Sequence, residues 1–452
     1  MSDLHPRPDS PAYMALLKRL HFYIGLLIGP FLLVTALSGV AYALTPQLEN
    51  WLYSDVLQAR STGLAKPLDE QIRSAQHAAG HQAMIGAVRA APGPGDTTRV
   101  MFSDSRLGPS ESLAIFVDPA TAMVLGERHV YGTSGVLPLR TAIDQFHRSL
   151  LLGEPGRLYS ELAASWLWLA ALGGLILWLA NPAATGRRGS LRKLHRTLGL
   201  WLLLGLLFFS VTGLTWSRYA GDNIGVLRHQ FGWSTPSVST ALVPDTQPAV
   251  VDEHAEHHHH GTAMNMPVAQ PEQFVGVLNT ARAAGIDAGK VEIKPGRDAQ
   301  SAWVVREINA RWPTQVDAVA VDPRNLQIVD QARFVDYPLA AKLTRWGIDA
   351  HMGLLFGLLN QLILVVTGLG LVVMVIMGYL MWWRRRPLVA RQPTLISAWR
   401  ELSGRGRVTL LLIAALLGVA LPVMGASLLM LLALDLALTL RASTARAVDG
   451  AR

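Results

Sequence analysis

The chain has no cysteine among its 452 residues. A chain without cysteine forms no disulfide, no thiolate nucleophile, no iron–sulfur cluster and no covalent haem link through Cys-x-x-Cys-His. Any haem would therefore be held by histidine and packing alone. Charged residues are also few, at 16% of the chain, whereas half of the residues are apolar. These proportions favour a protein that crosses a membrane several times and has room for soluble domains.

Several apolar stretches are long enough to cross the hydrocarbon core, which takes about 20 residues of helix. Four of them lie near 20–44, 158–180, 195–216 and 353–383. A further stretch, 408–440, is interrupted at Pro422 and Gly425. As one straight helix it would reach about 50 Å, which is too long for a single crossing. We therefore expect an apolar hairpin that turns at Leu421-Pro422, either as two short spans or as a re-entrant segment.

Lysine and arginine cluster beside the ends of these stretches. The clusters are Lys18 and Arg19; Arg187, Arg188, Arg192 and Lys193; and Arg384, Arg385, Arg386 and Arg391. Because basic residues mark the cytoplasmic side of a span, the N-terminus is predicted to be cytoplasmic. The large segments 45–157 and 217–350 then face the periplasm. These loops explain most of the net charge of +8, so no nucleic-acid partner is needed.

The two halves of the chain repeat the same spacings. Gly39 and Gly213 each follow a histidine by 18 residues. Two Val-Asp-Pro turns, at 117–119 and 321–323, each place their aspartate 29 residues before a histidine. This agreement predicts an internal duplication in which a span, an outer domain and a second span occur twice, an arrangement that often places a central site between the repeats.

Each outer segment shows a helical pattern followed by runs rich in β-branched residues, which indicate strands. The predicted helices are 68–79 and 271–284. The predicted strands are 99–103, 113–117 and 123–125 in the first segment, and 301–308, 316–321 and 327–329 in the second. We therefore expect a small α+β module in each half.

Four histidines stand beside the four long apolar stretches: His21, His147, His195 and His351. Ionisable side chains in or beside a span are costly, so each is a functional candidate, although each alone could be a hydrogen-bonding residue at the interface. The predicted orientation puts His21 and His195 at the cytoplasmic face and His147 and His351 at the outer face. Two imidazoles from facing helices saturate a haem iron, so this set suits two haems.

Two b-type haems, each held non-covalently by two histidines, would form a path for single electrons. The hydrocarbon is about 30 Å thick, so irons near each face would lie about 20 Å apart. Gly25 and Gly199 each follow a histidine by four residues, where they leave room for a flat macrocycle or simply for helix packing. Arg148 and Arg196 directly follow two of the ligands. They could pair with haem propionates or anchor the helices at the interface.

Two further features of the sequence are candidate sites for metal binding or chemistry. The tract at His254, His257, His258, His259 and His260 could bind a transition metal, but a polar loop with incidental metal affinity is the favoured interpretation. Asp435 lies within the last apolar run and receives no chemical role.

The chain resembles the PepSY-associated transmembrane family, the iron-regulated membrane proteins that include ferric-siderophore reductases. The matching residues are the Leu-His-x3-Gly of the first span, the Val-Asp-Pro turns, FHRSLLLGEPGR at 146–157, HMGLLFG at 351–357, MWWRRRP at 381–387 and LPVMGASLL at 421–429. The resemblance implies a bacterial inner (cytoplasmic) membrane location, haem, and electron transfer to periplasmic ferric chelates. It leaves the chelate and the electron donor open.

The expected architecture is a polytopic α-helical membrane protein with two periplasmic α+β PepSY-like domains, an internal duplication and a C-terminal apolar hairpin. The expected segments are 1–44 (first span), 45–157 (first outer domain), 158–216 (second and third spans), 217–350 (second outer domain), 351–386 (fourth span) and 387–452 (linker and hairpin).

The leading hypothesis is a dihaem transmembrane reductase that acts on a ferric-siderophore type of chelate and resides in the lipid bilayer. The first alternative is a membrane-anchored PepSY module that binds a peptide or regulates a peptidase. The second is a metal transporter, which is disfavoured because the spans show no polar pathway beyond Asn360, Gln361 and a few hydroxyls.

Overall fold

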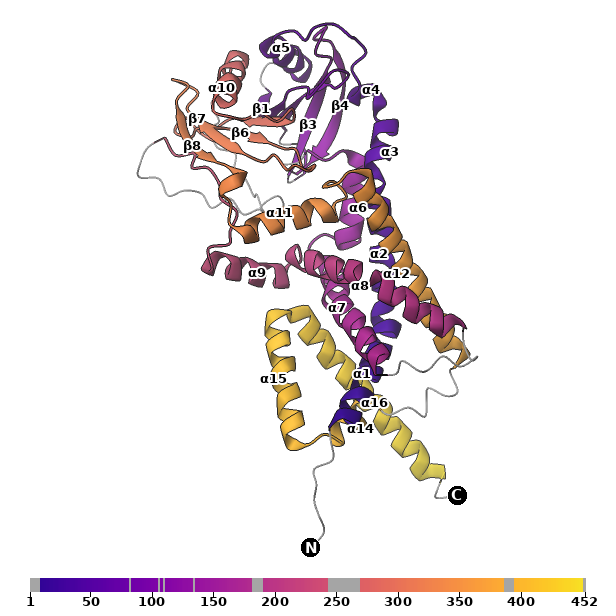
Figure 1. Cartoon of the computed structure of the whole chain (residues 1–452). Helices are drawn as coiled ribbons and strands as arrows, with labels where there is room; N and C mark the ends of the chain where they lie inside the picture. Colours follow the sequence, from indigo (N-terminus) through magenta and orange to yellow (C-terminus); the bar gives the residue numbers. More distant parts are fainter. Residues whose placement is uncertain are drawn as a thin grey trace. The chain divides into compact units, whose positions relative to one another are not determined.

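The computed structural model describes residues 9–80, 83–104, 106–108, 110–132, 135–180, 190–242, 269–385 and 394–449 (Figure 1). The chain divides into two compact units. The helical unit comprises Met1–Ala41, Gln145–Arg228 and Leu362–Arg452. The sheet unit comprises Tyr42–Asp144 and His229–Gln361.

Five helices in the described part of the chain are long and apolar enough to cross a membrane. They are Ser10–Ala43, Arg157–Leu179, Leu191–Thr215, Leu358–Arg384 and Pro422–Leu440. Leucine and tryptophan side chains remain exposed on them, such as Trp201 at 83% and Leu204 at 80%. Such outward apolar side chains suit contact with lipid.

The long helices correspond to the predicted spans, with two differences at their ends. The first helical segment begins at Ser10 and consists of α1 (Ser10–Tyr23), a π-helical segment η1 (Ile24–Ile28) and α2 (Gly29–Ala43). The others are α7 (Arg157–Leu179), α8 (Ser190–Thr215) and α12 (Leu358–Arg384). α12 begins at Leu358 rather than at residue 353, so His351 lies farther from the start of this span than predicted.

The C-terminal segment turns where the sequence predicted. After the short α14 (Leu395–Arg400) come α15 (Gly404–Ala420) and α16 (Pro422–Asp449), with the break at Leu421. Gly418 and Gly425 face each other across this hairpin. A Cβ on Gly425 would lie only 2.7 Å from the Gly418 Cα, so glycine is what allows the two helices to approach this closely.

Asp435 of α16 is completely buried and joins three helices. Its carboxylate accepts the Tyr23 hydroxyl of α1 at 2.5 Å and the Ile396 backbone N–H of α14 at 3.1 Å. The Arg19 Nε lies 3.9 Å away, and Arg19 donates to the Tyr23 hydroxyl at 2.8 Å. A buried carboxylate is stable only with such partners, so Asp435 ties the C-terminal hairpin to the first span.

Replacing Asp435 with alanine should destabilise the protein strongly, because it leaves the Tyr23 hydroxyl and the Ile396 N–H without their acceptor and removes the carboxylate beside Arg19. The expected loss is about 3–5 kcal/mol. Asp435→Asn, which keeps an acceptor oxygen, should lose less. Thermal unfolding of the purified protein in detergent measures both, with the exposed Leu429→Ala on the same helix as the control. Equal unfolding temperatures for Asp435→Ala and Leu429→Ala would contradict this role.

The sheet unit contains the same order of elements twice. After α3 (Thr45–Leu52) and α4 (Ser54–Leu57), the first half has α5 (Leu68–Ala79), β1 (Met84–Arg89), β2 (Thr98–Ser103), β3 (Glu111–Val117) and β4 (Val124–Tyr131). The second half has α10 (Pro271–Ala283), β5 (Val291–Lys294), β6 (Trp303–Glu307), β7 (Ala318–Val321) and β8 (Ile328–Ala332). Each half is thus one helix followed by four strands.

The two halves share one antiparallel sheet of eight strands, ordered β4-β3-β2-β1-β5-β6-β7-β8. The predicted modules are therefore joined through β1 and β5, two strands that the sequence reasoning did not identify. Helices α5 and α10 cover the same face of this sheet (Figure 1). Ile72 of α5 and Phe274 of α10 belong to a single hydrophobic core with Val88 and Ile293, which pair across the joint.

A buried ion cluster reinforces the joint between the halves. Glu292 of β5 is 2% exposed, and its Oε2 accepts Arg89 of β1 through Nε at 2.9 Å and Nη2 at 2.6 Å. Lys294 and Arg306 lie 3.7 and 3.5 Å from its Oε1. Burial alone would raise the pKa of Glu292, but Arg89 and the other two cations outweigh burial and hold that pKa below the ordinary value.

Because the folded pKa of Glu292 is lowered, the cluster stabilises the protein fully above the ordinary pKa of 4.5 and loses that effect as the pH falls through the folded value. Glu292→Gln should therefore cost about 3 kcal/mol at neutral pH, and the difference from the wild type should shrink in acid. Urea unfolding of the full chain across pH measures this. The matched control is Glu272→Gln, an exposed partner of Arg73 across the same joint. A difference from the wild type that does not change with pH would be inconsistent with this assignment.

Candidate cofactor site

Two of the predicted ligands come together in the helical unit. His21 lies on α1 and His195 on α8, and their rings are close enough for a charge on one to act on the other. The Nδ1 atoms of both are buried and have no hydrogen-bond partner among the described residues. A backbone hydrogen bond links the His21 ring to Ala170 and another links the His195 ring to Met374. Two neighbouring imidazoles from α1 and α8 fit a group bound between them.

Glycine makes room beside His21. A Cβ added to Gly25, one turn after His21, would have no neighbouring atom within 4 Å, so that side of η1 is open. Gly174 of α7 lies against the ring, because a Cβ there would come within 3.3 Å of the His21 Cε1. Gly199, one turn after His195, instead faces Met374, whose methyl group would lie 3.1 Å from an added Cβ. The space predicted from the glycines is therefore present at Gly25 and filled by a flexible side chain at Gly199.

The helix is irregular directly after His21, a feature that the sequence reasoning missed. Residues Ile24–Ile28 form a π-helical turn, and such turns often occur at functional sites. Pro30 follows, and proline cannot donate to the carbonyl four residues earlier, that of Leu26. The Tyr379 hydroxyl of α12 donates to this carbonyl at 2.5 Å. Pro30 within an apolar helix was the signal for this irregularity.

His147 is held in a defined orientation at the end of α6 (Pro138–Ser149). Its Nδ1 lies 2.9 Å from the Ser38 hydroxyl of α2. When the Ser38 hydroxyl donates to the Val34 carbonyl, at 2.8 Å, it accepts from His147. In that arrangement the proton sits on Nδ1 and Nε2 carries a lone pair. Ligating histidines are usually oriented through their second nitrogen in this way.

The backbone around His147 is fixed by the next helix. The Tyr159 hydroxyl of α7 donates to the His147 carbonyl at 2.8 Å, and the Ser160 hydroxyl donates to the Arg148 carbonyl at 2.7 Å. Gly153, in the turn between the helices, has a φ of 65°, which glycine adopts without strain. His147 thus lies on a short helix before the span.

His351 is the last residue of α11 (Leu339–His351) and belongs to the sheet unit. Asn360 donates to the neighbouring Ala350 carbonyl at 2.9 Å. Two residues earlier, the buried Asp349 accepts two hydrogen bonds from Arg345, at 2.9 and 2.8 Å. Gly357, six residues after His351 as Gly153 is after His147, also has a left-handed φ, of 57°. The pairing of His147 with His351 stays a prediction, since they belong to different units.

Arg148 and Arg196 are half-buried, and their contact with haem propionates stays a prediction. The tract at His254, His257, His258, His259 and His260 lies outside the described residues. No group of three or more His, Asp or Glu side chains in the described ranges could hold a bare metal ion. A haem, in contrast, needs only two axial ligands.

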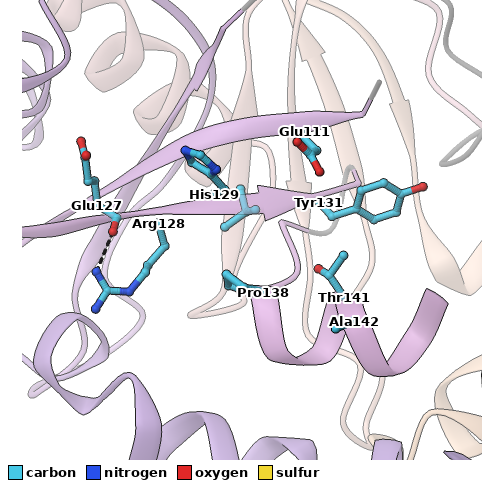
Figure 2. A pocket seen from close by; sticks show the side chains of 9 residues that line it. Glu111, Glu127, Arg128, His129, Tyr131, Pro138, Thr141 and Ala142 are labelled. Carbon is cyan, nitrogen blue, oxygen red and sulfur yellow. Dashed lines mark hydrogen bonds between the residues drawn. The ribbon is translucent and has the colours of Figure 1, made fainter. Parts of the chain in front are cut away.

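A separate cavity of about 540 Å³ lies in the sheet unit along β4, the edge strand (Figure 2). Its lining includes Glu111, His129, Tyr131 and Thr141. Arg128 at its end donates to the Glu127 carbonyl at 2.7 Å and to the Asp55 carboxylate at 2.6 Å. The hollow is open, and its exposed lining is more apolar than polar.

Apolar helices long enough to span a bilayer, combined with an antiparallel sheet domain, define a membrane protein with a large extramembrane part. The chain belongs to the family described as the PepSY-associated TM region, which matches residues 18–385. No curated protein matches the sequence.

Ser38→Ala should loosen the His147 ring by removing the acceptor of its Nδ1 proton. Loss of such an orienting partner typically lowers metal affinity 10–100-fold, so if His147 ligates a haem, the haem-to-protein ratio after purification should fall. Thr215→Val is the control, because that hydroxyl bonds to its own helix at Thr212. Unchanged haem content and an unchanged absorption spectrum in Ser38→Ala would refute an orienting role for Ser38.

Proposed function

We propose that the protein is a dihaem electron carrier of the bacterial inner membrane that reduces a ferric chelate of the siderophore type. The observation that carries the proposal is that His21 of α1 and His195 of α8, both half-buried in one helical unit, lie close enough for a charge on one to act on the other. Two facing imidazoles saturate a haem iron, and such a haem passes single electrons because it has no open position for dioxygen.

His21 and His195 would hold one haem, and His147 and His351 the other. The surrounding apolar side chains of α1, α7 and α8 exclude water from the first pair. Ser38 keeps the Nδ1 proton of His147 in place and leaves Nε2 free to bind iron. Each ferric ion gains one electron and becomes ferrous, while a quinol or a cytoplasmic reductant loses one. Ferrous iron binds hard oxygen chelators more weakly, so the reduction releases the metal.

The distribution of charge supports a cytoplasmic N-terminus. Most of the described basic residues at one set of helix ends are exposed: Lys18, Arg192, Lys193, Arg384 and Arg385. Arg19 is half-buried beside Tyr23. Basic residues at span ends are retained on the cytoplasmic side, so the sheet unit would lie in the periplasm, where ferric chelates arrive.

The repeated element order supports an internal duplication. In each half, one helix and four strands are followed by a short helix with a histidine near its end, a turn with a left-handed glycine, and an apolar helix. A duplicated unit would supply each haem with equivalent ligands from the two halves, as proposed for both pairs.

Haem stoichiometry tests the proposal directly. Pyridine haemochrome analysis of the wild type should give two b-type haems per chain, and His21→Ala and His351→Ala should each remove or alter one. His129→Ala, in the β4 cavity, is the matched control and should retain both. A colourless preparation from haem-replete cells would rule out the proposal.

A second candidate function is a PepSY module that binds a peptide. The cavity along β4 favours it, because an extended peptide can add to the free edge of a sheet. This function would survive replacement of all four histidines by alanine, which the dihaem function would not.

A further inference from the structure

Helix α11 exposes a row of large apolar side chains. Leu339 is 68% and Leu343 56% exposed, one turn apart, and Val335 just before the helix is 66% exposed. The helix buries Ala341 and Asp349 on its other side. Full burial of a leucine or valine side chain is worth about 1.5–3 kcal/mol, so a row left open implies a partner.

A chain of aromatic rings adjoins this helix. Trp346 of α11 lies 5.4 Å from Trp312, measured between ring centroids, and 5.8 Å from Phe334. Trp312 lies 6.3 Å from Phe356, and its backbone N–H donates to the Leu355 carbonyl at 2.8 Å. Trp312 and Phe356 are each 56% exposed. The aromatic chain therefore links α11 to the residues that lead into α12.

The exposed face continues into a span. Leu358 and Leu359, the first residues of α12, are 64% and 63% exposed, and this helix is long and apolar enough to cross a membrane. Phe356 stands immediately before them. The row on α11, the aromatic chain and the start of the span thus form one apolar strip within the sheet unit.

We infer that this strip lies in the headgroup layer of the bilayer, with α11 as an interfacial helix. Tryptophan prefers that layer because its ring is apolar and its N–H is polar, and amphipathic helices bury their leucines at the boundary with the acyl chains. Arg311 and Arg333, both exposed near the strip, supply the positive charge that lipid phosphates attract. The consequence is that His351, the last residue of α11, is held at the membrane surface.

A soluble aromatic ligand stacked on Trp312 is the competing occupant of this face. Binding of a soluble ligand requires the exposed face of α11 to be open to water, whereas lipid contact requires water to be excluded from that face. Measuring what reaches α11 in a bilayer therefore distinguishes the two.

The absence of native cysteine allows a clean test in the full chain. Leu339→Cys and Leu343→Cys carry a nitroxide label, and the protein is reconstituted in lipid nanodiscs. Accessibility to oxygen, which concentrates in lipid, is compared with accessibility to a water-soluble nickel chelate. Leu64→Cys, at a sheet-unit residue that is 96% exposed, is the aqueous control. The oxygen-to-nickel ratio should be several-fold higher at 339 and 343 than at 64.

Labels at 339 and 343 that are as accessible to nickel as the label at 64 would overturn the inference and show that the face meets water. In Trp312→Ala with the label at 343, the ratio should fall toward the value at 64, because the aromatic anchor is lost. An unchanged ratio in that variant would overturn the anchoring role of Trp312. Neither readout depends on haem, so this result stands apart from the haem stoichiometry.

Discussion

Polar groups placed among apolar helices must find hydrogen-bond partners inside the protein, because neither lipid nor apolar side chains can supply them. The helical unit meets this requirement with side chains from distant segments. Tyr379 binds the carbonyl that Pro30 leaves free, and Tyr23 with the Ile396 N–H satisfies Asp435. The Nδ1 atoms of His21 and His195 have no hydrogen-bond partner among the described residues, as is also true of the buried Ser165 hydroxyl of α7.

The four histidines reach their positions in two different ways. His21 and His195 lie within long apolar helices, so they come together through helix packing. His147 and His351 lie near the ends of α6 and α11, the short helices that precede spans, and each is followed by a turn with a left-handed glycine. The second arrangement depends on contacts with neighbouring helices, such as the hydrogen bond between His147 and Ser38 of α2.

The sequence predicted the elements that local patterns encode and missed those that depend on distant partners. Hydropathy located the spans, and 68–79 and 271–284 became α5 and α10 almost to the residue. β5 was missed because it is only four residues long, and the pairing that joins β1 to β5 links residues about two hundred apart. The hydrogen bonds of Asp435 could not be predicted either, because its partners come from the distant helices α1 and α14. The histidines themselves were identifiable by residue type and spacing, but the Ser38 contact that sets the tautomer of His147 was not.

The joint between β1 and β5 has a consequence for how the protein is made. Arg89 and Glu292 are separated by 203 residues, and helices α7 and α8 are synthesised between them. At a translation rate of about 5–20 residues per second, β1 emerges about 10–40 seconds before the strand that will cover it. During that interval its backbone groups form an open sheet edge, which is prone to pairing with the wrong strand. Biogenesis of this chain therefore includes a period in which the first half must be shielded until the second half is translated.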